Sequence, residues 1–238
     1  MHFQKVVLII HNKIMTNLPI ILDNLIEEEL QDQIEDAMFD CPWCYRSDNV
    51  LESKVLGTKY RKILNPFQYD ISPTFVADIA TPANKKTYDK VLPVVKEGCN
   101  KINFNIEKIK RCIAAIHATI RDQQRHDTIH VNADIPHLVM LYYVNDSDGD
   151  TILYDKTLKD IPFGTDYPDD YCKLNITHRI SPKKGRVLFF NGSVYHASSA
   201  PTKSMRCIIT LDLFGEFKDG SYKFPAPIEN KKCNFMYQ

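Results

Sequence analysis

From residue 130 onward the chain is a series of short apolar segments separated by turn residues, and this pattern constrains the fold more than any other feature. The segments rich in Val, Leu, Ile, Tyr and Phe are expected to form strands: they are Leu138–Val144, Thr151–Tyr154, Arg186–Phe190 and Cys207–Phe214. Asp, Asn, Pro and Gly residues lie between them, as in the segment 146–149. Short strands broken by such turns favour a β-sandwich or a barrel-like core.

The N-terminal half is expected to carry supporting helices. Apolar residues recur near a 3.6-residue spacing from Ile20 to Met38, with Asp23 or Asn24 as the candidate cap. A second helix is predicted from about Lys85 to Lys101, and the region 103–120 has a mixed pattern. The 238 residues suit a single domain. Its expected parts are a mixed helical support region over 1–125, a β core over 126–217 and a C-terminal tail over 218–238.

Charge and cysteine usage exclude several classes of function. Thirty Lys and Arg balance thirty Asp and Glu, so no basic surplus indicates a nucleic-acid partner. No apolar run approaches the roughly 20 residues of a membrane-spanning helix, and the run 6–10 is too short for a signal peptide. Met15 is an alternative start to Met1. Seven Cys at irregular spacing indicate a reducing, cytoplasmic compartment. The sequence carries no pattern that indicates an oligomeric state.

Cys41-Pro42-Trp43-Cys44 has the spacing of a thiol redox motif. A redox site of this kind needs a strand before it and a helix after it, which lower the pKa of the first thiol. Here a helical pattern precedes the motif instead. We therefore expect Trp43 to serve in packing or at a substrate rim, with a thiol redox protein retained as an alternative.

Five polar residues of the strand-rich half suit a metal ion and an acidic co-substrate. In the segment 130–132, His130 and Asn132 are two residues apart and so point to the same side of an extended chain. His196 follows His130 by 66 residues, and Arg206 follows His196 by ten. Imidazole is a good ligand for Fe(II), and a guanidinium binds a carboxylate through two parallel hydrogen bonds. Thr210 shares the strand face of Arg206 and is placed to donate to the same carboxylate.

In this order, the residues and their neighbours resemble the prolyl-4-hydroxylase-like branch of the Fe(II)- and 2-oxoglutarate-dependent oxygenases, including its phage-type members. The segments that carry the resemblance are 130–137, 141–145, 148–151, 181–185 with 188–190, and 205–210. The resemblance implies an α+β chain, mainly β, whose double-stranded β-helix (jelly-roll) core is supported by N-terminal helices. It also implies a location in the cytoplasm, including that of a virus-infected host cell.

The same resemblance implies a site and a reaction. Fe(II) would be bound by His130, residue 132 and His196, which form the catalytic centre. The co-substrate 2-oxoglutarate would be held by Arg206, Thr210 and Tyr143. Together with O2, these cofactors support hydroxylation of a C–H bond, with release of succinate and CO2. The implied substrate is a protein residue, such as a prolyl residue, or a small molecule.

Asn132 departs from the family pattern, which has Asp or Glu at this position. A neutral amide oxygen is a weaker ligand, so the substitution should lower metal affinity, and changes outside the ligand shell alone typically cost 10–100-fold. Three alternatives stay open. Asn132 ligates through its oxygen; Asp134, two residues on, supplies the carboxylate; or the site is degraded or repurposed, and the chain is a non-catalytic binding protein on the same fold.

Overall fold

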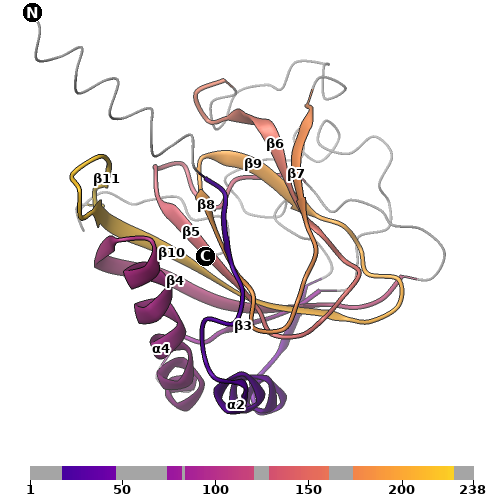
Figure 1. Ribbon diagram of the computed structural model, residues 1–238. Coiled ribbons are helices and arrows are strands. Elements are labelled where there is room, and N and C mark those ends of the chain that lie inside the picture. Colours follow the sequence, from indigo (N-terminus) through magenta and orange to yellow (C-terminus); the bar gives the residue numbers. More distant parts are fainter. Residues whose placement is uncertain (1–17, 47–73, 82–83, 121–128, 161–173, 228–238) are drawn as a thin grey trace, which may run out of the picture.

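The computed structural model describes residues 18–46, 74–81, 84–120, 129–160 and 174–227. Within these residues it has two helices, α2 (Glu28–Phe39) and α4 (Lys85–Lys101), and a predominance of strands (Figure 1). The strands are β1 (Ile20–Leu22), β2 (Cys44–Arg46), β3 (Thr74–Asp78), β4 (Phe104–His117), β5 (Leu138–Tyr143), β6 (Thr151–Thr157), β7 (Ile176–Ile180), β8 (Val187–Asn191), β9 (Val194–Ser198), β10 (Arg206–Phe217) and β11 (Lys223–Phe224). The expected fold class, mainly β with supporting helices, is confirmed.

The strands form two antiparallel sheets. The large sheet has the order β1-β8-β5-β10-β4-β3-β2, with β11 beside β10, and the small sheet has the order β7-β6-β9. The chain alternates between them: β5 lies in the large sheet, β6 and β7 in the small sheet, β8 in the large, β9 in the small and β10 in the large. This winding of an antiparallel strand pair back and forth between two sheets is the double-stranded β-helix, or jelly roll.

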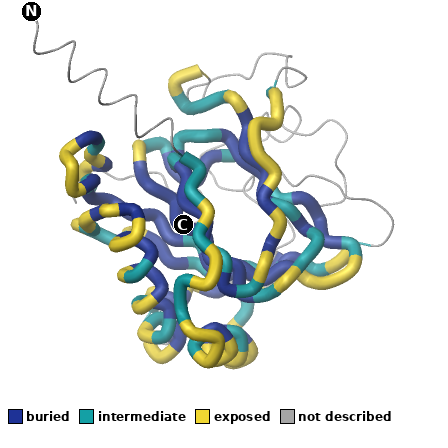
Figure 2. Tube along the Cα trace, in the orientation of Figure 1, coloured by how far each residue is buried: buried dark blue, intermediate teal, exposed yellow. Residues whose placement is uncertain are grey.

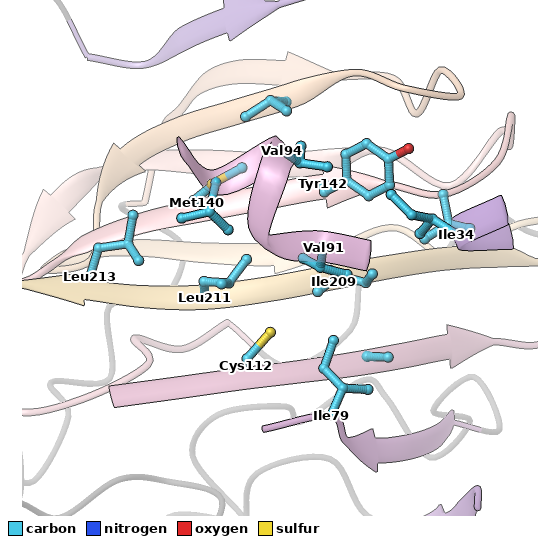
Figure 3. Close-up of a cluster of buried hydrophobic side chains, with 14 of the residues drawn as sticks. Ile34, Ile79, Val91, Val94, Cys112, Met140, Tyr142, Ile209, Leu211 and Leu213 are labelled. Carbon is cyan, nitrogen blue, oxygen red and sulfur yellow. The ribbon is translucent and has the colours of Figure 1, made fainter. Parts of the chain in front are cut away.

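Both helices pack on the face of the large sheet that points away from the small sheet (Figure 1). Val91 and Val94 of α4, with Ile34 of α2, contact sheet residues such as Met140 and Tyr142 (Figure 3). Burial of each such apolar side chain contributes roughly 1.5–3 kcal/mol to folding. The helices expose their outer sides, whereas β5 is buried along its whole length (Figure 2).

A second cluster of apolar side chains fills the space between the two sheets. Because side chains alternate along a strand, β5 buries Met140 and Tyr142 under the helices and Val139, Leu141 and Tyr143 against the small sheet. On β10, Ile208 belongs to this inner cluster, so residues 206, 210 and 212 share its inward face. The inner face of β10 therefore carries the polar residues that the sequence singled out.

The predicted helix from Ile20 to Met38 is wrong at its start. Residues Ile20–Leu22 form β1, which pairs with 187–189 of β8, and the helix begins only at Glu28. Asn24 has a φ of 54°, a left-handed conformation that no helix contains, so neither Asp23 nor Asn24 caps α2. The helix predicted over 85–101 is confirmed with the same bounds.

Most of the mixed region 103–120 is one long strand, β4 (Phe104–His117), that pairs with β10 along its length. The register shifts between Asp212 and Leu213 and again between Phe214 and Gly215. A shift exchanges the faces to which side chains point, which explains why no single alternation was visible in the sequence. The four strands predicted in the C-terminal half are confirmed to within three residues at each end, whereas β7, β9 and β11 were not predicted.

The surroundings of Cys41 and Cys44 do not match a thiol redox site. Helix α2 precedes the pair and strand β2 begins at Cys44, the reverse of the required order. Burial raises the pKa of the Cys41 thiol, whereas a reactive cysteine has a lowered pKa. Trp43 donates from Nε1 to the carbonyl oxygen of Met38 at 2.8 Å, in keeping with a packing role.

Among the described residues, no helix is long and apolar enough to cross a membrane.

Candidate functional site

His130 and His196 lie side by side although 66 residues separate them in the chain. Their backbones exchange two hydrogen bonds of 2.9 Å, from each N–H to the other residue's carbonyl oxygen. The centroids of the two imidazole rings are 4.5 Å apart, with the ring planes tilted by 52°. The predicted imidazole pair is therefore brought together by an antiparallel bridge that joins His130 to His196 of β9.

The protonation state of His196 is fixed by its surroundings. Its Nδ1 lies 2.9 Å from the carbonyl oxygen of Val194, and because a carbonyl only accepts, Nδ1 carries the proton. Burial, and then the neighbouring His130, hold the pKa of the His196 imidazole well below its ordinary value, so the ring is neutral. Its Nε2 therefore keeps a free lone pair. This is the arrangement in which metal-binding histidines are held.

Asn132 is buried, and its amide is oriented by a carboxylate. Its Nδ2 donates to Oδ1 of Asp212 at 3.1 Å. Because a carboxylate cannot donate, the opposite orientation of the amide would bring two acceptors together. The Oδ1 atom of Asn132 is therefore the oxygen that the side chain can offer to a ligand or a metal ion.

Asp212 is fully buried and is held by one further side chain, with a second one nearby. Arg111, directly opposite on β4, places Nε 2.7 Å from Oδ2 and donates from Nη2 to Oδ1 at 3.1 Å. The Nε2 atom of His137 lies 3.5 Å from Oδ1 of the same carboxylate. Sequence reasoning missed both Asp212 and Arg111. The available signal was Asp212 itself, a charge in an apolar strand at even spacing from Arg206 and Thr210.

Asp134 was considered as a substitute carboxylate for Asn132. It is half-buried, and burial raises the pKa of its carboxyl group. In the described part of the chain, no three His, Cys, Asp or Glu side chains come close enough to hold a metal ion, so Asp134 does not join the two imidazoles in such a group. The structure instead places Asp212 next to the side chain of residue 132.

Arg206 is only 1% exposed, and it connects the large sheet to the strand of His196. Its Nη1 donates to Oγ of Ser198 at 2.8 Å, and its Nη2 donates to Oγ1 of Thr151 at 2.7 Å. Ser198 and Thr151 face each other in the small sheet. Because Ser198 follows His196 by two residues on β9, the two side chains share a strand face about 7 Å apart. The guanidinium thus lies close to the imidazole pair.

Tyr143 belongs to the same hydrogen-bond network as Arg206. Its hydroxyl donates to Oγ1 of Thr151 at 2.7 Å, and the Arg206 Cζ lies 5.8 Å from the centre of its ring. Burial raises the pKa of the phenol, so the hydroxyl remains a donor. Thr210 lies on the inward face of β10 between Arg206 and Asp212, opposite Leu141 of β5. The predicted site residues that lie in one inner region or at its edge are therefore His130, Asn132, Tyr143, His196, Arg206 and Thr210.

The residues present fit a divalent cation and a dicarboxylate. Two imidazoles, one with its lone pair fixed, and an amide oxygen are donors that Fe(II) accepts. A buried guanidinium with hydroxyl neighbours suits a carboxylate. The departure from a two-histidine, one-carboxylate set is that the acid, Asp212, lies behind the amide of Asn132.

Comparison with solved structures identifies the same fold. The chain is similar to a carbocyclase, SnoK from nogalamycin biosynthesis, described as non-heme and α-ketoglutarate-dependent (TM-score 0.57, 12% identity, 90% of each chain covered). It is similar to an oxidoreductase of the 2OG-Fe(II) oxygenase family from Burkholderia pseudomallei (0.55, 9%, 92% of each chain). It is also similar to a prolyl hydroxylase from Trichoplax adhaerens, solved with a peptide of hypoxia inducible factor (0.50, 18%, 89% of this chain and 90% of the other). No protein-family model and no curated protein sequence matches the chain. The resemblance drawn from the sequence is confirmed at the level of the fold.

Proposed function

We propose that this chain, which has the fold of the Fe(II)- and 2-oxoglutarate-dependent oxygenases, is itself an oxygenase of that kind. The observation that carries the proposal is the convergence of His130, His196 and Arg206, which come from distant parts of the sequence, in one region between the two sheets. A fold hosts many functions, so the proposal rests on these side chains rather than on the fold alone.

Each side chain has a role that follows from its surroundings. His130 and His196 would hold Fe(II) through ring nitrogens, and Asn132 through its amide oxygen. Bound Fe(II), together with 2-oxoglutarate, supplies the activation of O2 needed to oxidise an unactivated C–H bond. Arg206 would bind the far carboxylate of 2-oxoglutarate, with Tyr143 and Thr210 as further donors to it.

The structure also supports exclusion of water from the co-substrate. Arg206 and Tyr143 are fully buried, and the apolar side chains of the inner cluster cover the adjoining parts of β5 and β8. An ion pair between Arg206 and a carboxylate is much stronger in such a place than in water. The buried guanidinium can therefore fix the orientation of the co-substrate.

The proposed reaction is hydroxylation of a protein residue, including a prolyl residue, or of a small molecule. Support for a prolyl substrate comes from the similarity to the Trichoplax adhaerens prolyl hydroxylase, and support for a small molecule comes from the similarity to SnoK. The proposed cofactors are Fe(II), 2-oxoglutarate and O2, and the proposed location is the cytoplasm.

The test is an anaerobic titration of the protein with Fe(II) and then with 2-oxoglutarate. We expect a visible charge-transfer band when both are present and formation of succinate when air is admitted. His196→Ala should abolish the band, whereas His178→Ala, which changes an exposed histidine of β7, should leave it intact. The absence of both band and succinate in the wild-type protein contradicts the proposal.

A second candidate function is a non-catalytic binding protein on the same fold. Asn132 favours it, because a neutral amide replaces the acid and the nearby Asp212 is paired with Arg111. This candidate predicts that a dicarboxylate binds through Arg206 without added metal and without turnover. Isothermal calorimetry in the presence of a chelator, followed by a succinate assay, separates it from the oxygenase.

A further inference from the structure

We infer that Asp212 is a positioning residue that turns the amide of Asn132 into a metal ligand. Asp212 would hold Nδ2 of Asn132 and thereby present its Oδ1 to the ion between the imidazoles. This inference rests on the proposed function, since it concerns the third ligand of the same site. It assigns a role to a carboxylate that lies on β10, far in sequence from the first histidine.

The contact between the two residues allows one orientation only. Asp212 is 0% exposed and Asn132 is 3% exposed, so water does not compete for either group. The hydrogen bond from Nδ2 to Oδ1 of Asp212 is 3.1 Å long, and its acceptor is ionic. A flipped amide would turn its oxygen against the carboxylate in a medium of low dielectric constant, which is strongly unfavourable.

The carboxylate is itself fixed in place. Arg111 contacts both of its oxygens from the neighbouring strand, and His137 approaches Oδ1. The ring of His137 is held by a contact of 2.7 Å from Nδ1 to the carbonyl oxygen of Ile135. A Cβ atom on Gly192 would lie 2.1 Å from Nε2 of His137, so the ring packs directly on that backbone. Asp212 is thus held by Arg111 and enclosed by the fixed ring of His137, as a group that orients a ligand must be.

The hydrogen bond also changes the chemistry of the amide. Donation from Nδ2 to a carboxylate polarises the amide and increases the electron density on its oxygen. Carboxylates act in this way on metal-binding histidines, where they fix the ring and raise the basicity of the ligand. The negative charge that the resemblance places at residue 132 would then act from Asp212, one hydrogen bond away.

The first test is a double-mutant cycle in the affinity for Co(II), measured from its visible absorption. The variants are Asp212→Asn, Asn132→Ala and the combination of both. If Asp212 acts through Asn132, Asp212→Asn weakens Co(II) binding by about 10–100-fold in the wild-type background. The same change should have less than about a threefold effect in the Asn132→Ala background. Equal losses in the two backgrounds would mean that Asp212 acts only by its charge through space, and would overturn the inference.

Loss of the Asp212 charge beside Arg111 is expected to destabilise the fold, so the cycle is repeated with Arg111→Gln present in every protein. That change leaves no buried guanidinium facing the new amide in the Asp212→Asn variants. The expected non-additivity is the same. Additive losses in this second cycle overturn the inference just as they do in the first.

The second test needs no metal and uses the melting temperature of the metal-free protein. Asn132→Asp alone replaces a hydrogen bond with two carboxylates at about the same separation, and should lower the melting temperature. Combining it with Asp212→Asn restores a donor opposite an acceptor. With Arg111→Gln present in both proteins, so that no guanidinium is left facing the new amide, the double variant should melt at a higher temperature than Asn132→Asp. It should also bind Co(II) at least as tightly as the wild type, because the carboxylate is now in the ligand position.

The outcomes separate the inference from the function on which it rests. A wild-type protein that binds no Co(II) overturns the proposed function and the inference together. A wild-type protein that binds Co(II), with additive losses in the cycles, overturns the inference alone. In the Arg111→Gln background, a double variant that melts no higher than Asn132→Asp shows that no hydrogen bond between the two side chains is restored, and this too overturns the inference.

Discussion

Replacement of Arg206 by Lys tests the co-substrate site while it keeps the positive charge. In the structure, Arg206 uses both terminal nitrogens, one on Ser198 and the other on Thr151, and its fork is fixed by these contacts. A lysine has one ammonium group and cannot form two parallel hydrogen bonds with a carboxylate. The substitution should therefore remove about one charged hydrogen bond to 2-oxoglutarate.

A hydrogen bond to a charged group contributes about 1.5–3 kcal/mol, so the Kd for 2-oxoglutarate should rise by about 10–150-fold. The folded state should lose about 1–2 kcal/mol, because one of two buried hydroxyl contacts is lost, and the melting temperature should fall by about 2–8 °C. Isothermal calorimetry of 2-oxoglutarate binding to the Mn(II)-loaded protein measures the first quantity. Thermal unfolding measures the second.

Arg186→Lys is the matched control. Arg186 is a partly exposed guanidinium that also makes a forked contact, with both carboxylate oxygens of Asp23, but on the surface of the protein. Surface pairs contribute about 0–1 kcal/mol, and this variant should bind 2-oxoglutarate within about twofold of the wild type. If Arg206→Lys is folded and its Kd also lies within twofold, Arg206 does not bind the co-substrate and the reasoning is refuted.

Three further changes probe the surroundings of the site. Hydrogen bonds overcome the effect of burial and lower the pKa of Asp148 to about 2, so its contribution to stability is complete above about pH 4 and is lost as the pH falls to about 2. Asp148→Asn should lower the free energy of unfolding by about 1–2 kcal/mol near pH 7. In urea unfolding, the difference in this free energy between wild type and variant should shrink toward pH 2; an equal difference at both pH values contradicts this. Gly192→Ala should lower the free energy of unfolding by about 1–3 kcal/mol, because its Cβ overlaps the fixed ring of His137; wild-type stability would show that the ring can move. Tyr143→Phe removes the donor to Thr151 and should cost about 0.5–1.5 kcal/mol while weakening 2-oxoglutarate binding; an unchanged Kd in calorimetry would leave Tyr143 a structural role only.

The sequence was most informative where a residue type is rare in its surroundings. His130, His196 and Arg206 are polar residues in strand-forming segments, and their order is typical of one family, so their proximity could be predicted from sequence. The helix 85–101 could be predicted because its apolar residues keep one period over 17 residues.

The sequence was misleading where tertiary pairing overrides local periodicity. Residues Ile20–Leu22 continue the spacing of the helix that follows, yet they form a strand because β8 offers an unpaired edge. The strand β4 could not be recognised, because its charged residues are spread over both faces and its pairing with β10 shifts register twice, with the extra residues Lys110 and Glu107 on β4. The three residues of β1 are too few to show the alternation of a strand, and a bulge interrupts that alternation in β4.

The role of Asp212 could not be predicted from the positions of the histidines. It depends on β10 lying beside β4, which brings Arg111 opposite Asp212, and on a turn that brings Asn132 to the same place. Only the even spacing of Asp212 from Arg206 and Thr210 indicated that its side chain lies on the inner face of the strand. A carboxylate that acts from a different strand than the ligand leaves no spacing pattern in the sequence.

The most direct measurement is a crystal structure of the protein grown with Mn(II) and 2-oxoglutarate under anaerobic conditions, with anomalous diffraction to locate the metal. The account predicts one Mn(II) bound by ring nitrogens of His130 and His196 and by Oδ1 of Asn132, with the far carboxylate of 2-oxoglutarate on Arg206. A metal ion bound elsewhere, or a dicarboxylate on Arg206 with no metal beside the imidazoles, would contradict it.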